Sequence, residues 1–403
     1  MPAARLLDLT RLVSRLGRGA LTGVDRVELA YLDRFIEGDA REGFPLFAIL
    51  NSKRGFLLLD AAGARHVAAL ARGQAPLRPA PLLARLRGQG DLQRMAAEAE
   101  LRALAIRRMP AFALPLLLRG LPRGTTYFNT GHANLSAGFL AGLGRAGLRR
   151  IVLVHDVIPL DYPEYTRAGI PAVFERKMAA VSAAADLVIH TTRDARARTE
   201  RQLARLGRVP PGIVAPLGIT LAAPAPVRLP GLDLARPWFL AIGTIEPRKN
   251  HALLLDLWVR LAARLPQAQM PQLVIAGGRG WNNEEVFRRL DARPPHVIEA
   301  QGLSDGALVT LLQGARALLF PSFAEGFGLP PAEAAALGCP VIANALPVLR
   351  EILGDYPVYL PVSDDYSWLE TIIQAATHPR QQAGPRWQPP DWGQHFNAVL
   401  SGI

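Results

Sequence analysis

The segment 243–250 (Gly-Thr-Ile-Glu-Pro-Arg-Lys-Asn) lies between an expected strand and an expected helix, and it places two cations, Arg248 and Lys249, side by side. Asn250 is a favourable N-cap, but two cations beside the positive end of a helix dipole are locally unfavourable. A diphosphate would offset them, because open α/β sheets bind ligands at the carboxyl ends of their strands. The alternative is a solvated loop whose charges point away from the helix. Lys249 is one of three lysines among 46 basic residues, which indicates that a compact point charge is needed there.

A second segment, 320–333 (Phe-Pro-Ser-Phe-Ala-Glu-Gly-Phe-Gly-Leu-Pro-Pro-Ala-Glu), runs from an apolar strand through a turn into a helix with proline in its first positions. This order is typical of an anion-binding helix N-terminus, and Gly326 and Gly328 would let backbone N–H groups approach a sugar or phosphate closely. We expect Glu325 and Glu333 to face one cleft and to hold different parts of one ligand. Without a ligand, Glu325 would be an exposed loop acid, and Glu333 would only favour the dipole of the first helical turn.

The elements that must position these segments alternate strand and helix, which predicts α/β layers with mostly parallel strands. At 403 residues the chain is expected to form two domains, since single cores rarely grow beyond roughly 250 residues. The proline-rich segment 221–237 predicts a linker between them. We therefore expect an N-terminal domain over 1–225, a C-terminal domain over 226–388 and a terminal helix over 389–403.

Expected strands of the first domain lie at 4–9, 46–50, 126–129, 151–155 and 187–191. Those of the second lie at 238–243, 272–276, 296–299, 317–320 and 340–343, with helices near 251–265, 284–291, 305–315 and 331–337.

The net charge of +12 lies entirely in the N-terminal half. Residues 1–220 hold 32 basic and 18 acidic residues (+14), whereas residues 221–403 hold 14 and 16 (−2). The imbalance suggests that this half faces an anionic membrane surface or a phosphate-bearing substrate. The alternative is an arginine-rich composition with solvated charges. Nucleic acid is not an expected partner, because no basic stripe with interleaved aromatics and no zinc-finger spacing occurs.

Half of the residues are hydrophobic and a fifth are charged, which is typical of a soluble globular protein. Residues 1–18 lack an uninterrupted apolar stretch, and the longest uncharged stretches are broken by prolines, so neither export nor a spanning helix is expected. Cys339 lies in an apolar run and is expected in the core. These features predict a cytoplasmic protein, with peripheral contact with the inner face of the cytoplasmic membrane as a further expectation.

Together the two segments make residues 238–353 resemble the donor domain of retaining GT-B glycosyltransferases of family 4, because the Arg-Lys-Asn segment and the Glu-x7-Glu motif match in order and spacing. The resemblance implies that Arg248 and Lys249 bind the diphosphate and stabilise its leaving charge. It also implies that Glu325 holds the transferred sugar and that Glu333 takes the ribose hydroxyls. The donor-binding residues that it implies are Gly23, Gly243, Arg248, Lys249, Gly302, Leu303, Ser304, Glu325, Gly326, Phe327, Gly328, Leu329 and Glu333.

Three N-terminal segments, 22–28, 129–134 and 155–161, are similar to segments of bacterial family 4 enzymes of surface-polysaccharide assembly, several of them mannosyltransferases. By this resemblance residues 22–26 form the first βα loop beside the phosphates, and His155 joins Arg248, Lys249 and Glu325 as a catalytic candidate near the reacting carbon. A double glycine is frequent where this chain has Gly23 and Val24. The candidates on the acceptor side are Thr22, Arg26, His132 and Asp156, although a hydrogen-bonded structural role is favoured for His132.

The resemblance further implies two Rossmann-like domains facing a cleft, a terminal helix that packs back on the N-terminal domain, and transfer with retention and no protein nucleophile. GDP-mannose is the expected donor and a UDP-sugar the alternative. The expected acceptor is a glycan or lipid-linked glycan in assembly of surface polysaccharide, lipopolysaccharide or exopolysaccharide. A sugar-nucleotide epimerase and a non-catalytic nucleotide-sugar scaffold at the membrane remain open. No cofactor or metal is expected, because the chain has no His-x-x-x-His pair and no Asp-x-Asp.

Overall fold

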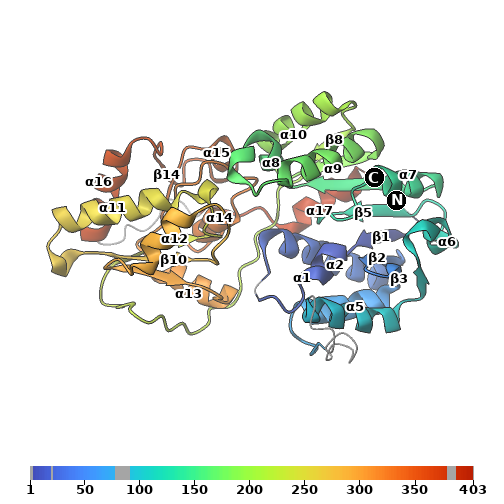
Figure 1. Ribbon diagram of the computed structural model, residues 1–403, viewed down its shortest axis with the longest axis horizontal. Helices are drawn as coiled ribbons and strands as arrows, with labels where there is room; N and C mark the ends of the chain where they lie inside the picture. The colour runs from blue at the N-terminus through green and yellow to red at the C-terminus, as the bar shows by residue number, and fades with distance from the viewer. Residues whose placement is uncertain (1–2, 20, 78–90, 379–386, 403) are drawn as a thin grey trace.

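The computed structural model describes residues 3–19, 21–77, 91–378 and 387–402. They form two α/β domains placed end to end along the longest axis of the molecule (Figure 1). Each domain has a central sheet with helices on both faces, so that most strands are buried on both sides and appear in the sequence as nearly continuous apolar runs. The alternation of strands and helices predicts this α/β architecture, and the chain length predicts two domains.

The N-terminal sheet has the strand order β4-β3-β2-β1-β5-β6-β7-β8. Its strands are β1 (Arg5–Asp8), β2 (Leu46–Ser52), β3 (Gly55–Leu59), β4 (Arg107–Met109), β5 (Thr126–Asn129), β6 (Arg149–Val154), β7 (Leu187–His190) and β8 (Gly212–Val214). Pairing is parallel except in the β2–β3 and β3–β4 pairs. The sequence did not predict β3 and β4, because β3 is apolar without the alternation that marks a strand and two of the three residues of β4 are arginines.

Two apolar clusters hold helices on the two faces of this sheet. The first cluster contains side chains of α1 (Thr10–Arg15), α2 (Gly23–Glu42), α3 (Ala61–Ala71) and α5 (Leu92–Leu104). The second contains side chains of α6 (Leu114–Leu118), α7 (Ala137–Arg145), α9 (Ile170–Ala184) and α10 (Arg193–Leu206). Three short elements lie in the connections: η1 (Ala111–Ala113) precedes α6, and α8 (Ile158–Asp161) and η2 (Pro163–Tyr165) lie between β6 and α9.

The C-terminal sheet is wholly parallel, with the order β11-β10-β9-β12-β13-β14. Its strands are β9 (Trp238–Ile242), β10 (Gln272–Ala276), β11 (Val297–Ala300), β12 (Ala317–Phe320), β13 (Val341–Ala343) and β14 (Val358–Tyr359). The helices are η3 (Pro247–Lys249), α11 (His251–Arg264), η4 (Gln267–Gln269), α12 (Glu284–Asp291), α13 (Asp305–Gly314), α14 (Leu329–Ala336), α15 (Pro347–Leu353) and α16 (Asp365–Thr377). Cys339 is fully buried in this domain, as expected.

The two sheets are joined by a segment without helix or strand that includes residues 221–237. After α16 the chain returns, and α17 (Trp392–Ser401) lies on the N-terminal domain (Figure 1). Phe396 is buried there, and the Tyr31 hydroxyl lies 2.8 Å from Nε2 of His395. The exact domain boundaries at 225 and 388 stay predictions. No helix in the described part of the chain is both long and apolar enough to cross a membrane.

Candidate functional site

Arg248, Lys249 and Glu325 form one ion-paired cluster at the carboxyl edge of the C-terminal sheet. Arg248 Nη1 lies 2.9 Å from Glu325 Oε2, and Lys249 Nζ lies 2.7 Å from Glu325 Oε1. Arg248 Nη2 also donates to Glu246 Oε1 at 2.6 Å. Arg248 and Lys249 follow β9, and Glu325 follows β12, its neighbour in the sheet. The sheet order therefore brings together two segments that are about 76 residues apart in sequence.

The ionisation of this cluster is fixed by its partners. Burial raises the pKa of Glu325, but Arg248 and Lys249 outweigh burial and lower that pKa to about 2. Burial lowers the pKa of Arg248, yet the carboxylates of Glu325 and Glu246 raise it above its ordinary value. Burial also lowers the pKa of Lys249, which Glu325 partly offsets. At neutral pH Arg248 and Glu325 therefore form a charged pair.

One expectation about this segment is corrected. Asn250 adopts a left-handed conformation (φ 55°, ψ 43°), and its side chain does not cap α11. Asn250 ends the 3-10 turn η3 and also precedes the first residue of α11, but its left-handed backbone differs from the extended conformation in which an N-cap side chain accepts a hydrogen bond from the helix. Within the protein, the charges of Arg248 and Lys249 are offset by Glu325 and Glu246. The sequence missed Glu246, although it stands two residues before Arg248.

The turn at Gly326 is where the N-terminal domain touches this cluster. A Cβ atom at Gly326 would lie 2.7 Å from Oδ2 of Asp156 and 3.0 Å from the carbonyl oxygen of His155. Thr191 donates a hydrogen bond to the Gly326 carbonyl oxygen at 3.4 Å. Burial raises the pKa of the Asp156 carboxyl, and Arg248 opposes that rise. Glycine is therefore required at 326 by the close approach of the other domain.

The first turns of α2 and α14 face each other across the domain boundary. A Cβ atom at Gly23 would lie 3.0 Å from Cδ1 of Leu329, and Arg26 Nη1 donates to Glu333 Oε1 at 2.6 Å. Burial raises the pKa of Glu333, and Arg26 opposes that rise. Two helix N-termini, which carry partial positive charge, thus meet at this point.

The expected loop over residues 22–26 is wrong: α1 follows β1 directly, and α2 begins at Gly23. Thr22 precedes the helix, and its N–H and hydroxyl both donate to Asp25, at 2.9 and 2.6 Å. These hydrogen bonds start the helix earlier than the sequence suggested. On the other side α14 begins at Leu329 instead of Pro331, so Glu333 lies beyond the first helical turn in which it was expected.

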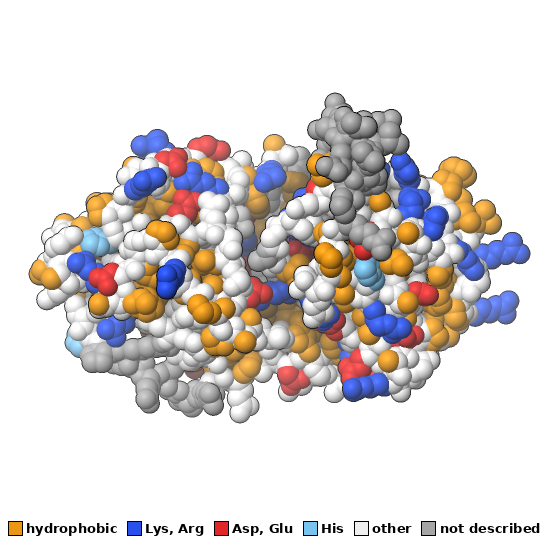
Figure 2. All heavy atoms as spheres, turned by 90° about the horizontal axis from the view of Figure 1, so that it is seen from below, with side chains coloured by type: hydrophobic (Ala, Val, Ile, Leu, Met, Phe, Trp, Pro, Cys, Tyr) orange, Lys and Arg blue, Asp and Glu red, His pale blue; other side chains and the backbone are white. Residues whose placement is uncertain are grey.

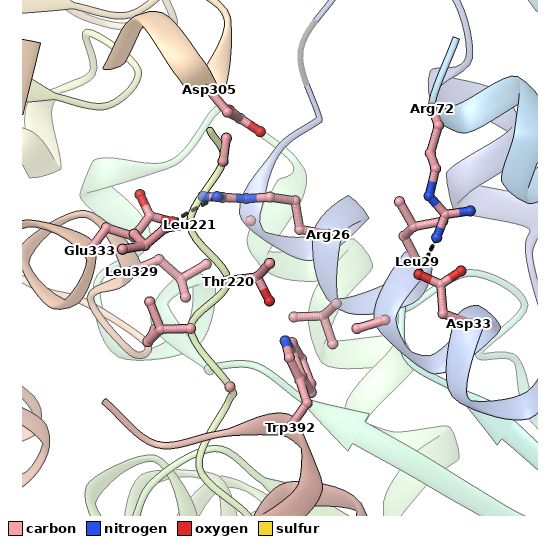
Figure 3. A pocket seen from close by; sticks show the side chains of 16 residues that line it. Arg26, Leu29, Asp33, Arg72, Thr220, Leu221, Asp305, Leu329, Glu333 and Trp392 are labelled. Atoms are coloured by element: carbon pink, nitrogen blue, oxygen red, sulfur yellow. Dashed lines mark hydrogen bonds and ion pairs between the residues drawn. The ribbon is translucent and has the colours of Figure 1, made fainter. Parts of the chain in front are cut away.

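A cavity of about 330 Å³ lies beside the Arg26–Glu333 pair, between α2, the chain after β8, α14 and α17 (Figure 3). Arg26 and Glu333 point toward each other on one side of it, Trp392 lies on another, and Asp305 lies near the guanidinium (Figure 3). Asp305 begins α13 directly after Gly302, Leu303 and Ser304; the Ser304 hydroxyl caps that helix at 3.2 Å from Ala307 N. The structure thus places the 302–304 loop next to the cavity wall.

His132 and His155 lie together in the N-terminal domain, with ring centroids 5.2 Å apart. Nε2 of His155 is 2.7 Å from the Thr130 carbonyl oxygen, and Nε2 of His132 is 3.0 Å from that of Leu153. Burial lowers the pKa of His155 to about 4 and that of His132 well below its ordinary value. Both rings are therefore neutral at pH 7 and donate from Nε2 to backbone carbonyl groups.

Two further contacts between the domains had no signal in the sequence. Glu351 of α15 accepts hydrogen bonds from the backbone N–H groups of Arg193 (2.6 Å) and Asp194 (3.0 Å), which begin α10. The rings of Tyr165 and Phe323 stack, with centroids 5.5 Å apart. The molecule remains hollowed between the domains, with charged side chains visible in the hollow (Figure 2). Among the described residues, no three His, Cys, Asp or Glu side chains gather as metal ligands.

The fold is that of GT-B glycosyltransferases: two Rossmann-like domains whose sheets present their carboxyl edges to a shared boundary. Anabaena Alr3699/HepE in complex with UDP and glucose matches with a TM-score of 0.58 at 14% identity, over 100% of both chains. Sucrose-phosphate synthase from Thermosynechococcus elongatus matches with a TM-score of 0.58 at 16% identity, over 99% of this chain and 100% of that one. The expected fold class is confirmed.

Residues 230–384 match the family model described as Glycosyl transferases group 1. The serotype-specific mannosyltransferase WbdA of Escherichia coli is 28% identical over 264 residues, 61% of this chain and 32% of that protein. The O-antigen chain mannosyltransferase RfbU of Salmonella typhimurium is 31% identical over 141 residues, 34% of this chain and 37% of that protein. The chain thus matches about a third of the length of these curated relatives, and it resembles O-antigen mannosyltransferases.

Glu325→Gln should lower the free energy of unfolding by about 3 kcal/mol, because it leaves Arg248 and Lys249 buried with one carboxylate fewer. The folded-state pKa of Glu325 is depressed to about 2, so its contribution is present above its unfolded pKa and is lost as pH falls toward 2. Urea unfolding at a series of pH values measures this difference between wild type and variant.

Glu285→Gln is the matched control, since Glu285 pairs with Arg288 on the exposed face of α12 and should leave stability unchanged. Equal stability of Glu325→Gln and wild type at neutral pH would contradict the description of the cluster.

Proposed function

We propose that the protein is a glycosyltransferase that moves a hexose from a nucleotide sugar to a glycan acceptor. The observation that carries this proposal is the buried Arg248–Glu325–Lys249 cluster at the carboxyl edge of the C-terminal sheet, against the facing domain. Two largely buried cations in fixed positions suit a leaving diphosphate, because they can stabilise its developing negative charge without moving during the reaction. The match of residues 230–384 to glycosyl transferases supports the same activity.

In this proposal the diphosphate binds Arg248 and Lys249, which now pair with Glu325. A phosphate bound to these cations weakens their ion pairs with Glu325. The carboxylate oxygens of Glu325 can then accept hydrogen bonds from hydroxyls of the transferred sugar. The N–H groups of residues 326–329 lie at the start of α14, where the helix dipole favours negative charge. One cluster thus binds both the leaving group and the sugar.

The nucleoside would lie beyond the diphosphate, toward Glu333. The Glu333 carboxylate, now paired with Arg26 at 2.6 Å, would accept the ribose hydroxyls, and the base would lie along residues 302–304. The cavity of about 330 Å³ next to this pair gives room on that side of the site. In this proposal, nucleotide binding replaces Arg26 by the ribose hydroxyls as the partner of Glu333.

We further propose that transfer retains configuration without a protein nucleophile, with the departing phosphate assisting removal of the acceptor proton. His155 is neutral, and its Nε2 donates to a backbone carbonyl group, so it suits an uncharged role in positioning the sugar better than proton transfer. Arg248 and Lys249 would supply the charge stabilisation, and closure of the domains the orientation. Asp156, close to Gly326, would lie on the acceptor side.

GDP-mannose is the proposed donor, and the mannosyltransferases among the relatives support it. UDP and glucose in the Anabaena HepE structure support a UDP-sugar as the alternative. The proposed setting is bacterial surface-polysaccharide assembly on the cytoplasmic side, without a metal or other cofactor. An epimerase of the same architecture would convert one nucleotide sugar into another without acceptor. A transferase would release free nucleotide only when acceptor is present, and a non-catalytic scaffold would bind donor without turnover.

A thermal-shift series with GDP, UDP, ADP and their sugars tests the donor. A ligand that binds only the folded state stabilises it by RT ln(1 + [L]/Kd), about 2.7 kcal/mol at a hundredfold excess over Kd. We expect the largest shift from GDP-mannose, and we expect EDTA to leave it unchanged. No shift with any nucleotide would contradict the proposed site, and a shift abolished by EDTA would contradict metal independence.

Arg248→Ala and Lys249→Ala should each lower the turnover number by roughly 10²- to 10³-fold, because the developing phosphate charge loses a donor that is worth about 3 to 4 kcal/mol in comparable sites. Steady-state kinetics with acceptor present, on variants shown to be folded by circular dichroism, measures the change. Arg288→Ala, on the exposed face of α12, is the matched control and should keep wild-type turnover. Near-normal turnover in both cluster variants would remove these cations from the mechanism.

Glu333→Gln should weaken nucleoside diphosphate binding by roughly tenfold or more, because hydrogen bonds from the ribose to a charged acceptor are worth about 1.5 to 3 kcal/mol. Isothermal titration calorimetry gives the affinity. Arg26→Gln breaks the same ion pair but keeps the carboxylate, so it separates loss of the ribose acceptor from loss of the contact between domains. The ribose assignment fails if Glu333→Gln and wild type bind equally well, or if Arg26→Gln alone reproduces the defect.

A further inference from the structure

The segment 111–118 (Ala-Phe-Ala-Leu-Pro-Leu-Leu-Leu) contains no polar side chain, yet one of its faces is exposed. It forms η1 and α6 at the edge of the N-terminal domain. Leu114 and Leu117 are buried beneath it, whereas Phe112 is 88% exposed and Leu116 is 53% exposed. A helix that is apolar on all sides is normally buried on all sides. The outward face therefore indicates a partner that accepts apolar side chains.

This face is held by its neighbours and is not a free loop. Arg107 of β4 donates to the carbonyl oxygens of Leu117 (3.2 Å) and Arg119, at the end of α6. A Cβ atom at Gly142 of α7 would lie 2.9 Å from Leu114, so the inner face of α6 packs closely on α7. The arrangement presents Phe112 and Leu116 outward on a fixed support.

The chain on both sides of this segment carries charge of one sign. Residues 101–155 contain eight arginines and no aspartate or glutamate. Arg108 before the apolar segment, and Arg119 and Arg123 after it, are exposed. Apolar side chains flanked by exposed arginines match a bilayer with anionic lipid, whose head groups attract the guanidinium groups while the hydrocarbon takes Phe and Leu.

The position of the face is compatible with an open site. In Figure 1 α6 lies at the end of the N-terminal domain farthest from the C-terminal domain. Figure 2 shows hydrophobic and basic side chains gathered at that end, away from the hollow between the domains. A membrane on this surface would leave the hollow between the domains open to solvent.

We propose that the face formed by Phe112 and Leu116, with Arg108, Arg119 and Arg123, docks the protein on an anionic bilayer. The proposal depends on this surface and not on the proposed glycosyl transfer. Arg107 is excluded from the docking residues, because it supports α6 from within.

Cosedimentation with vesicles of phosphatidylglycerol and phosphatidylcholine in equal parts, against phosphatidylcholine alone, tests the proposal. Binding is expected only with the anionic vesicles, and it should fall between about 0.01 M and about 1 M salt as the Debye length drops from about 30 to about 3 Å. Phe112→Ser and Leu116→Ser should each weaken it by roughly tenfold, the factor that burial of such a side chain contributes. Arg108→Ser with Arg119→Ser should reduce its salt-sensitive part, because only Arg123 of the three docking arginines remains.

Val259→Ser is the matched apolar control, because Val259 is 66% exposed on α11 of the other domain. Arg41→Ser is the charge control, on an exposed arginine of the same domain that pairs with Glu37. Both should bind anionic vesicles as the wild type does.

A second readout does not depend on pelleting. Leu116→Cys labelled with an environment-sensitive fluorophore should shift its emission to shorter wavelength with anionic vesicles only; native Cys339 is buried and out of reach of the label. Three results would overturn the proposal: no binding to anionic vesicles at low salt, binding unchanged in Phe112→Ser and Leu116→Ser, or a wild-type dimer in sedimentation velocity that Phe112→Ser dissociates.

Discussion

Arg248, Lys249 and Glu325 form a largely buried ion-paired cluster at the carboxyl ends of β9 and β12. The rest of the site is arranged around that cluster. Glu325 can neutralise Arg248 and Lys249 together only if the loop after β12 turns sharply back toward η3. The Phe323 N–H group donates to the Arg248 carbonyl oxygen at 2.8 Å and holds this turn in place. The turn then passes Gly326 beneath Asp156 of the other domain and begins α14 at Leu329. The position of the N-terminal domain therefore depends on the same loop that pairs the charges.

The acids proposed to bind substrate are paired with cations of the protein. Glu325 pairs with Lys249 and Arg248, and Glu333 pairs with Arg26. Such pairs keep buried charges satisfied when no substrate is present, since an isolated buried charge is costly. Substrate binding is then an exchange of partners, and only the difference between the two sets of contacts contributes to affinity. The Arg26–Glu333 pair joins the two domains. In the proposed mechanism its exchange for the ribose also couples nucleotide binding to the relative position of the domains.

The sequence predicted most of the C-terminal domain because its strands are short apolar runs separated by turn residues. The strand at 272–276 and the helix at 284–291 coincide with β10 and α12. It did not predict the antiparallel β3–β4 edge, which lacks a period-two pattern, or the left-handed Asn250, whose residue type fits both a cap and a turn. Contacts between the domains could not be predicted from the sequence. Glu351 and the α10 N-terminus are about 157 residues apart, and no local pattern relates them. From the sequence, Arg248 and Lys249 could be predicted to need an anion nearby. Their ion pairs with Glu325 could not be predicted, because Glu325 is distant in the sequence.

The most direct test of the account is a crystal structure of the protein with the nucleoside diphosphate that gives the largest thermal shift. The account predicts the diphosphate within hydrogen-bond distance of Arg248 and Lys249, the ribose hydroxyls on Glu333, and Glu325 no longer paired with Lys249. A diphosphate bound elsewhere, with the Arg248–Glu325–Lys249 cluster intact, would contradict it.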